Sequence, residues 1–157
     1  MKERYNVRVI LHRKTRIAKV SGDPGNSNKE FLLLLARKGY CQFPQGGIES
    51  GEKVIDAARR EVLEETNLRI RGMDISSESL VQTIYFAERK GEPVKIFLRA
   101  IAAEVMEGSD DVFLGNPNGD GHKDWQWVSY SRAYDLLVEY PEQRKVFEEV
   151  CKKAKLQ

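Results

Sequence analysis

The stretch GGIESGEKVIDAARREVLEETNL, at residues 46–68, constrains this chain more than any other part of its sequence. Gly46, Gly47 and Gly51 predict a tight loop, because a residue without Cβ accepts backbone angles and close contacts that other residues do not. From Glu52 onward the residues are good helix formers, with no Gly or Pro among them. We therefore expect a glycine-led loop followed by a helix.

Acidic side chains gather on one side of this expected helix. Ile55, Ala58 and Val62 recur at steps of three and four residues and predict a buried stripe. Glu61, Glu64 and Glu65 fall within an arc of roughly 100° beside it. Three carboxylates this close repel one another and raise one another's pKa unless a cation lies among them. Hard divalent ions such as Mg²⁺ bind oxygen ligands of this kind. The helix is therefore expected to hold a metal ion.

The same stretch resembles the signature of the Nudix hydrolases, G-x5-E-x7-R-E-U-x-E-E-x-G-U, in which U is aliphatic. We refer to residues 46–68 as the box. Its positions are matched in order by Gly46, Glu52, Arg60, Glu61, Val62, Glu64, Glu65 and Leu68. Only the last glycine differs: Asn67 stands where the helix should end in a left-handed residue, for which Asn is the best substitute. An ordinary solvated helix face would explain neither the glycine loop nor the spacing of Glu52.

The resemblance implies an α/β protein, an α/β/α sandwich with a mixed β-sheet, formed as a single domain by residues 1–157. It also implies Mg²⁺-dependent hydrolysis of a pyrophosphate linkage, with Mn²⁺ as an alternative ion. The leading substrate is a dinucleoside tetraphosphate or a (deoxy)nucleoside triphosphate. The segment QFPQGGI at residues 42–48 resembles the box entry both of enzymes that act on dinucleoside tetraphosphates and of enzymes that act on triphosphorylated RNA ends. An RNA 5′ end is the alternative substrate. A non-catalytic module that binds a nucleotide or a protein is the alternative function, although such a module has no need of intact metal carboxylates.

The resemblance also assigns roles to the box residues. The expected metal ligands are Glu61, Glu64 and Glu65, with a main-chain carbonyl of Gln45 or Gly46. Arg60 is expected to pair with a box carboxylate and hold its rotamer, which a planar guanidinium does better than an ammonium group. Glu52 is a supporting acid, or simply a negative charge that favours the start of the helix. The expected catalytic residues are thus Glu64, Glu65, Arg60 and Glu52.

The sequence leaves the general base open among four acids: Glu64, Glu65, Glu104 and Asp120. Some subfamilies carry Glu-His before an aromatic strand in this part of the chain. His122, Trp125 and Trp127 match that pattern, but Gly121 stands in the place of the glutamate. Asp120 or Asp124 could substitute for it, and His122 could equally be structural.

Substrate-binding candidates lie on both sides of the box. Arg37 and Lys38 could reach a phosphate, Tyr40 and Tyr85 could stack on a base, and His122 could contact the substrate. The alternatives are plain loop residues and core aromatics, and they apply equally to Phe97, Trp125 and Trp127. The N-terminal part is basic and predicts either a solvated surface or one that faces polyphosphate or RNA: Arg4, Arg8, Arg13, Lys14, Arg16 and Lys19.

Hydrophobic patterning predicts the rest of the secondary structure. Strands are expected at residues 5–11, 30–36, 68–73, 80–86, 94–105 and 122–128, with loops at 13–28 and 108–121. A helix capped by Ser129 or Ser131 should run to Leu137, and Pro141 should open the last helix. The apolar side of that last helix is expected to consist of Val146, Phe147, Val150 and Cys151.

Composition supports one ordinary globular domain. The 157 residues are 41% hydrophobic and 32% charged, and a formal charge of +2 points to no particular partner. No apolar run approaches the roughly 18 residues of a membrane helix, and the start lacks a signal-peptide pattern, so we expect a cytoplasmic protein. The separation of Cys41 and Cys151 suggests neither a zinc site nor a disulfide framework. We expect a monomer or a homodimer with a small nucleotide as its ligand.

Overall fold

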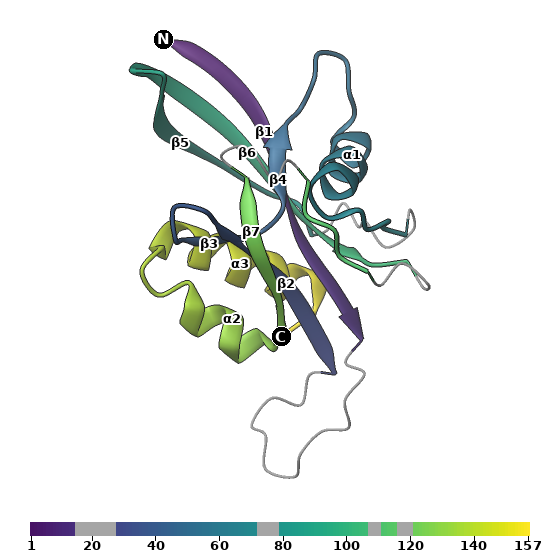
Figure 1. Ribbon diagram of the computed structural model, residues 1–157. Coiled ribbons are helices and arrows are strands. Elements are labelled where there is room, and N and C mark those ends of the chain that lie inside the picture. The colour runs from purple at the N-terminus through teal and green to yellow at the C-terminus, as the bar shows by residue number, and fades with distance from the viewer. Residues whose placement is uncertain (15–27, 72–78, 107–110, 116–120) are drawn as a thin grey trace.

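The computed structural model describes residues 1–14, 28–71, 79–106, 111–115 and 121–157 (Figure 1). Its helices and strands follow one another in this order: β1 (Lys2–Lys14), β2 (Lys29–Ala36), β3 (Cys41–Gln42), β4 (Gln45–Gly47), α1 (Val54–Thr66), β5 (Val81–Arg89), β6 (Glu92–Glu104), β7 (His122–Val128), α2 (Tyr130–Leu136) and α3 (Pro141–Ala154).

The strands form one mixed, seven-stranded sheet. Its main path is β3-β2-β1-β6-β5, while β4 pairs with β1 and β7 pairs with β2. The long central pair, β1 with β6, is parallel, and the other pairs are antiparallel. Along β1, Val7 pairs with Gly46 on one side and with Arg99 on the other. The short strand β4 is thereby held against the middle of the sheet.

Helices cover both faces of the sheet, with α1 on one side and α2 and α3 on the other (Figure 1). The alternation of side chains along each strand divides the core into two parts. Under α1 lie Val7, Val9, Leu11, Leu32, Leu34, Ile101 and Ala103. Under α2 and α3 lie Ile10, Phe31, Leu33, Ala100 and Ala102. The predicted α/β/α sandwich with a mixed sheet is confirmed.

The helix ends follow the sequence signals. Asn67 ends α1 with a left-handed φ of 62°, as its place after the helix predicts. The Ser129 side chain accepts a hydrogen bond from the Arg132 amide at the start of α2, and Pro141 is the first residue of α3. All four residues expected on the apolar side of α3 are buried: Val146, Phe147, Val150 and Cys151.

Several strand boundaries differ from the prediction. β1 and β5 are longer than expected, and the short strands β3 and β4 were not predicted. The expected strand at residues 68–73 is wrong over its described part, residues 68–71, where only an isolated bridge joins Ile70 to Val105. Two main-chain hydrogen bonds flank this bridge, from the Arg71 amide to the Glu104 carbonyl and from the Met106 amide to the Arg69 carbonyl. The expected loops at 13–28 and 108–121 lie largely outside the described residues.

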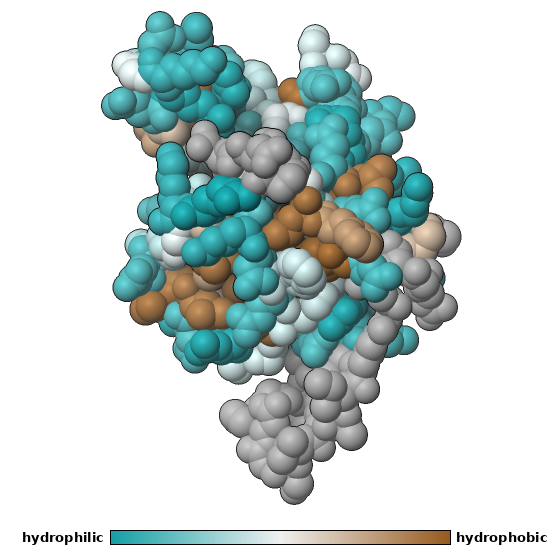
Figure 2. All heavy atoms as spheres, in the orientation of Figure 1, coloured by the Kyte–Doolittle hydropathy of each residue, from teal (hydrophilic) through white to brown (hydrophobic). Residues whose placement is uncertain are grey.

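Hydrophilic residues cover most of the face shown in Figure 2, with hydrophobic residues visible as patches between them. Within the described part of the chain, no helix is long and apolar enough to cross a membrane. Both cysteines are free thiols. Cys151 lies in the core, where burial raises the pKa of its thiol, and Cys41 is half-buried.

Candidate active site

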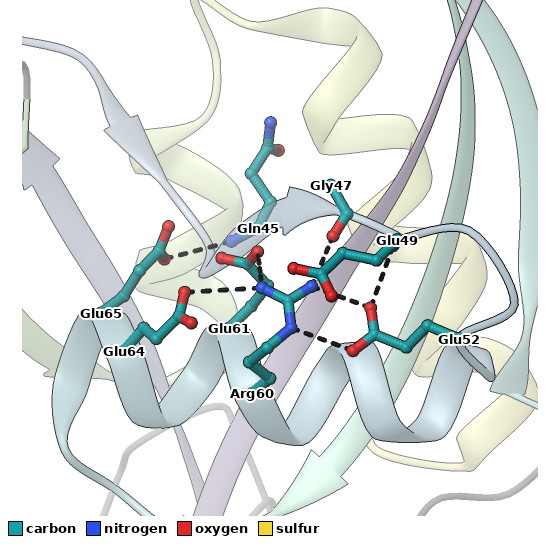
Figure 3. Close-up of polar contacts among 8 residues, drawn as sticks. All are labelled: Gln45, Gly47, Glu49, Glu52, Arg60, Glu61, Glu64 and Glu65. Carbon is teal, nitrogen blue, oxygen red and sulfur yellow. Dashed lines mark hydrogen bonds and ion pairs between the residues drawn. The ribbon is translucent and has the colours of Figure 1, made fainter.

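The acidic side chains of α1 point toward β4 (Figure 3). The helical spacing places Glu61, Glu64 and Glu65 on one side of α1, as predicted. Glu61 is buried, while the Glu64 side chain is 58% exposed. The main-chain amide of Gln45 donates a hydrogen bond to Glu65 Oε2 at 3.2 Å. The loop and the helix of the box therefore come together at β4.

Arg60 joins the two ends of this acidic cluster. Its guanidinium contacts both oxygens of Glu52 at 2.9 Å, and it donates to Glu61 Oε1 at 2.8 Å and to the Gly47 carbonyl at 2.7 Å. A longer ion pair of 3.5 Å reaches Glu64. The expected pairing of Arg60 with a box carboxylate is thus present. A planar group with this many fixed donors holds Glu52 and Glu61 in one orientation.

Gly46 makes room for the buried carboxylate. A Cβ built on Gly46 would lie 2.0 Å from Glu61 Cδ, far inside van der Waals contact, whereas a Cβ on Gly47 would meet nothing within 4 Å. Any side chain at position 46 would therefore displace the Glu61 carboxylate. The first glycine of the box is required by packing, rather than by an unusual backbone angle.

The carboxylates of the cluster differ in electrostatics. Hydrogen bonds from Arg60 and the Glu49 amide lower the pKa of Glu52 to about 2. Burial, with Glu61 and Glu64 close by, raises the pKa of Glu65 to about 8. Burial also raises the pKa of Glu61, because it outweighs the opposing contact with Arg60. Arg60 therefore stabilises the ionised form of Glu52, whereas burial favours the protonated forms of Glu61 and Glu65.

This donor set fits a hard divalent cation. Its potential ligands are carboxylate and carbonyl oxygens, which are the ligands that such ions prefer. The pKa values of Glu61 and Glu65 are raised, so ionisation of these two carboxyls would be favoured by a nearby positive charge. Across the described ranges, however, no three His, Cys, Asp or Glu side chains are arranged as the ligands of one ion. The guanidinium of Arg60 contacts Glu61 and Glu64 instead. The role of Glu61, Glu64 and Glu65 as metal ligands therefore stays a prediction.

A pocket of about 360 Å³ lies on the opposite face of the sheet, between α3 and strands β1, β5 and β6. Its polar lining consists of Arg8, Gln42, Gln45, Thr83, Tyr85, Glu142 and Gln143. Gln45 connects this pocket to the acidic cluster, because its amide bonds to Glu65 while its side-chain oxygen accepts from Arg8 Nε at 2.9 Å. A ligand that occupied both places would pass along β4.

The predicted substrate-binding residues separate into three groups. Tyr85 lines the pocket. His122 is buried behind it and contacts the pocket residue Gln42, and burial lowers the pKa of its imidazole. The remaining three lie in the connection between β2 and β3, where Arg37 and Lys38 are exposed and the ring of Tyr40 packs edge-on against Tyr140. None of these three lines the pocket.

The other aromatic residues considered for base stacking lie outside this pocket. Phe97 stacks on Tyr5 with ring centroids 5.0 Å apart, and Arg13 lies 4.0 Å above the ring of Trp127. Trp125 is 41% exposed on β7, and neither it, Phe97 nor Trp127 lines the pocket beside Tyr85.

Two of the four candidates for the general base lie outside the described site. Glu104 pairs with His12 of β1, whereas Gln45 pairs with Arg8, four residues earlier on the same strand. The Glu104 carboxylate also lies 3.9 Å from Lys29 Nζ. The structure therefore places Glu104 away from the acidic cluster, because strand register separates them. Asp120 lies outside the described residues. Glu64 and Glu65 remain in place.

The basic N-terminal part was expected to be either a solvated surface or one that faces polyphosphate or RNA. The first alternative is wrong for Arg8, which is only 6% exposed. Its alternation with the apolar residues of β1 directs it toward α3. Arg13 is also ordered, in an ion pair with Glu30 at 2.9 Å. Arg16 and Lys19 lie outside the described residues.

Sequence reasoning missed the polar pocket residues Gln42, Thr83, Glu142 and Gln143, and it named Arg8 only within the basic N-terminal part. These residues come from β1, β3, β5 and the first turn of α3, which are far apart in the sequence. The one available signal was Arg8, a charged residue between the apolar residues Val7 and Val9 of a predicted strand. A charge in that position indicates either a solvated face or a buried functional group.

Comparison with known proteins gives a consistent result. The model of the NUDIX domain family matches residues 15–150. A protein of Pelagibacter ubique named RNA pyrophosphohydrolase is 28% identical over 82% of this chain and 85% of its own length. A protein of the same name from Bartonella henselae is 30% identical over 63% of this chain, and the match spans 62% of that relative.

A solved structure has the same fold. It is the binary complex of an Ap4A hydrolase from C. elegans, which is 24% identical and aligns over 95% of this chain and 96% of its own, with a TM-score of 0.57. At this identity the likeness concerns the fold alone.

Proposed function

This chain belongs to the Nudix family, whose members hydrolyse pyrophosphate bonds, and we propose that it cleaves a pyrophosphate linkage in a nucleoside polyphosphate with the help of Mg²⁺. The observation that carries this proposal is the connection made by Gln45, between the acidic cluster on α1 and the pocket beside α3. A nucleoside in the pocket would extend its phosphate chain along β4 toward Glu65.

The metal would be held by Glu61, Glu64 and Glu65, with a main-chain carbonyl of Gln45 or Gly46. When bound, Mg²⁺ or Mn²⁺ offsets charge on phosphoryl oxygens and lowers the pKa of a coordinated water. The protein's own contribution is orientation. Arg60 fixes the rotamers of Glu52 and Glu61 through its hydrogen bonds, and the absence of a side chain on Gly46 lets the Glu61 carboxylate approach β4.

Glu64 and Glu65 are the proposed candidates for the general base. Glu65 is the more protected of the two, and its pKa of about 8 means that it holds a proton near neutral pH until a cation offsets the surrounding charge. Glu64 is more exposed and can reach solvent or substrate without a change in the backbone. Either carboxylate could accept the proton that the attacking water loses.

Two substrate classes follow from different observations. The box and the pocket for one nucleoside favour a dinucleoside tetraphosphate or a (deoxy)nucleoside triphosphate. The names of the relatives favour an RNA 5′ end as the second candidate, and the segment at residues 42–48 is compatible with both classes. In both cases the reactive group is a polyphosphate attached to a nucleoside, so the same carboxylates would serve.

The proposal is tested by a substrate panel assayed with and without Mg²⁺: nucleoside triphosphates, a dinucleoside tetraphosphate and a 5′-triphosphorylated RNA. Glu64→Gln should lower kcat at least a hundredfold on the best substrate, as is typical when an essential electrostatic group is lost. Glu88→Gln, an exposed acid on the β5 to β6 hairpin, is the matched control and should retain wild-type activity. Equal rates for wild type and Glu64→Gln would favour a non-catalytic binding module.

A further inference from the structure

Arg8 is a buried charge with an incomplete set of partners. It is 6% exposed, and burial lowers the pKa of its guanidinium. Its single hydrogen bond within the described structure runs from Nε to Gln45, and no described carboxylate forms an ion pair with it. Buried arginines are normally paired, because desolvation of an unpaired charge is costly. The Nη groups of Arg8 are therefore available to an acceptor on a ligand.

The pocket around Arg8 has the character of a base-binding site. Tyr85, Phe86 and Leu98 provide aromatic and apolar surface, and about 360 Å³ is at the small end of ligand pockets. Gln143 Oε1 is buried and has no hydrogen-bond partner in the described part of the chain. Glu142, also in the lining, is exposed at the first turn of α3. The pocket thus offers donors at Arg8 and acceptors at Gln143 and Glu142.

We propose that this pocket binds a guanine base of the substrate, with the Arg8 guanidinium donating to guanine O6 and N7. This inference rests on the proposed nucleotide substrate. Arginine donates to this pair of acceptors in the commonest specific contact with guanine. Guanine also carries N–H donors at N1 and N2, which match the acceptors of Gln143 and Glu142. Adenine has an amino group in place of O6, so it would direct a donor at the donors of Arg8.

A phosphate group suits the pocket less well. The carboxylate of Glu142 in the lining would repel an anion, and the surfaces of Tyr85 and Phe86 offer no polar partner for phosphoryl oxygens. Gln45 also holds Arg8 by its Nε, which orients the plane of the guanidinium and leaves its outer edge toward the pocket. A fixed planar fork of donors favours a flat ligand with two acceptors.

Calorimetric titration of the metal-free protein with guanosine and adenosine monophosphates tests this inference without any hydrolysis. The wild type should bind the guanosine nucleotide about tenfold more tightly. Arg8→Met should remove this preference, mainly by weakening the guanosine nucleotide. Arg99→Met is the matched control, because Arg99 is exposed and lies on the opposite face of the same sheet, and it should retain the preference. Thermal unfolding confirms that each variant is folded.

A second comparison varies the ligand and needs no variant. Inosine monophosphate keeps O6 and N7 but lacks the amino group at position 2, so it should bind much more like the guanosine than the adenosine nucleotide. Three results would overturn the inference: equal affinity for the guanosine and adenosine nucleotides, an equal loss for both in Arg8→Met, or inosine binding that matches adenosine. A guanine preference without hydrolysis of any panel substrate would refute the proposed function alone.

Discussion

The two faces of the sheet at β4 carry opposite kinds of chemistry. On the α1 face, the buried Glu61 and the half-buried Glu65 have raised pKa values, which a bound cation would lower. On the α3 face, Arg8 is a buried cation in a pocket lined by amides, aromatic rings and the exposed Glu142. Gln45 bonds to both, through its amide on one side and its side chain on the other. In the proposed function, a metal ion would bind at the α1 face, and the base of the substrate would bind at the α3 face.

In the proposed function, the α1 face serves catalysis and the α3 face serves recognition of the substrate. A cation would offset the charge of the α1 carboxylates and bind the phosphate groups, so rate would depend on the placement of these carboxylates. A base would occupy the α3 face, where hydrogen bonds and stacking determine which nucleotide binds. Variants on the α1 face should therefore change kcat, and variants on the α3 face should change KM or substrate preference. The predictions below test this division, beginning with the largest expected effect.

Gly46→Ala should reduce kcat by about a hundredfold or more while changing KM little. The new Cβ would overlap the Glu61 carboxylate and force it out of place. Gly47→Ala is the matched control, since a Cβ there meets nothing within 4 Å, and its steady-state kinetics should match the wild type. Similar losses in both variants would show that the loop backbone, rather than the placement of Glu61, is what matters.

Tyr85→Ala should raise KM about tenfold and leave kcat within a factor of three. The ring lines the pocket, and loss of one base-stacking surface typically weakens binding by about this amount. Phe97→Ala removes an aromatic ring from the neighbouring strand outside the pocket and serves as the control. An effect confined to kcat in Tyr85→Ala would break the proposed division between the two faces.

In EDTA, the unfolding temperature should fall by a few degrees as pH rises from 6.5 to 8. Unfolded Glu65 ionises near pH 4.5, whereas the folded group keeps its proton until about pH 8, so the native state binds more protons in this window. Burial lowers the pKa of His12 to about 4 and also lowers the pKa of His122, whereas unfolded imidazoles are still partly protonated near pH 6.5. The two histidines therefore oppose the fall at the lower end of this window and make it smaller than Glu65 alone would give.

Glu65→Gln should flatten that dependence of unfolding temperature on pH. Added Mg²⁺ should stabilise the wild type more at pH 8 than at pH 6.5, because a carboxylate must lose its proton before it binds a metal. A slope that persists unchanged in Glu65→Gln would assign the raised pKa to another group.

Asn67→Gly should have the smallest effect, with unchanged activity and a stability change below about 0.5 kcal/mol. Asn67 lies at φ 62°, which both Asn and Gly accept as the residue after a helix. Chemical denaturation and the same kinetic assay measure both quantities. A large loss of turnover would reveal a further role for the Asn67 side chain on the α1 face.

Local signals predicted much of this molecule. The spacing of Glu61, Glu64 and Glu65 correctly placed them on one side of a helix, and Asn67 was correctly expected to be left-handed. Membership of the Nudix family and the α/β/α sandwich are confirmed. The roles of the site residues stay predictions, as do the substrate and the single domain over residues 1–157.

Strand pairing, in contrast, could not be read from the sequence. The two short strands β3 and β4 were missed, although β4 brings Gln45 into contact with both Arg8 and Glu65. Glu104 was kept as a candidate base because its distance from α1 depends on the register of β6 with β1. Arg37 and Lys38 lie in the connection between β2 and β3 and do not line the pocket, and their expected contact with a phosphate stays a prediction.

The sequence by itself determined the box, the helix that carries its acids and the alternating strands, because each depends on residues within one or two turns of one another. The tertiary structure alone decided that Arg8, Tyr85 and Gln143 share a pocket, and that Gln45 connects it to Glu65. These contacts join residues far apart in the chain, and their proximity follows from strand register and helix packing, for which no short segment carries a signal.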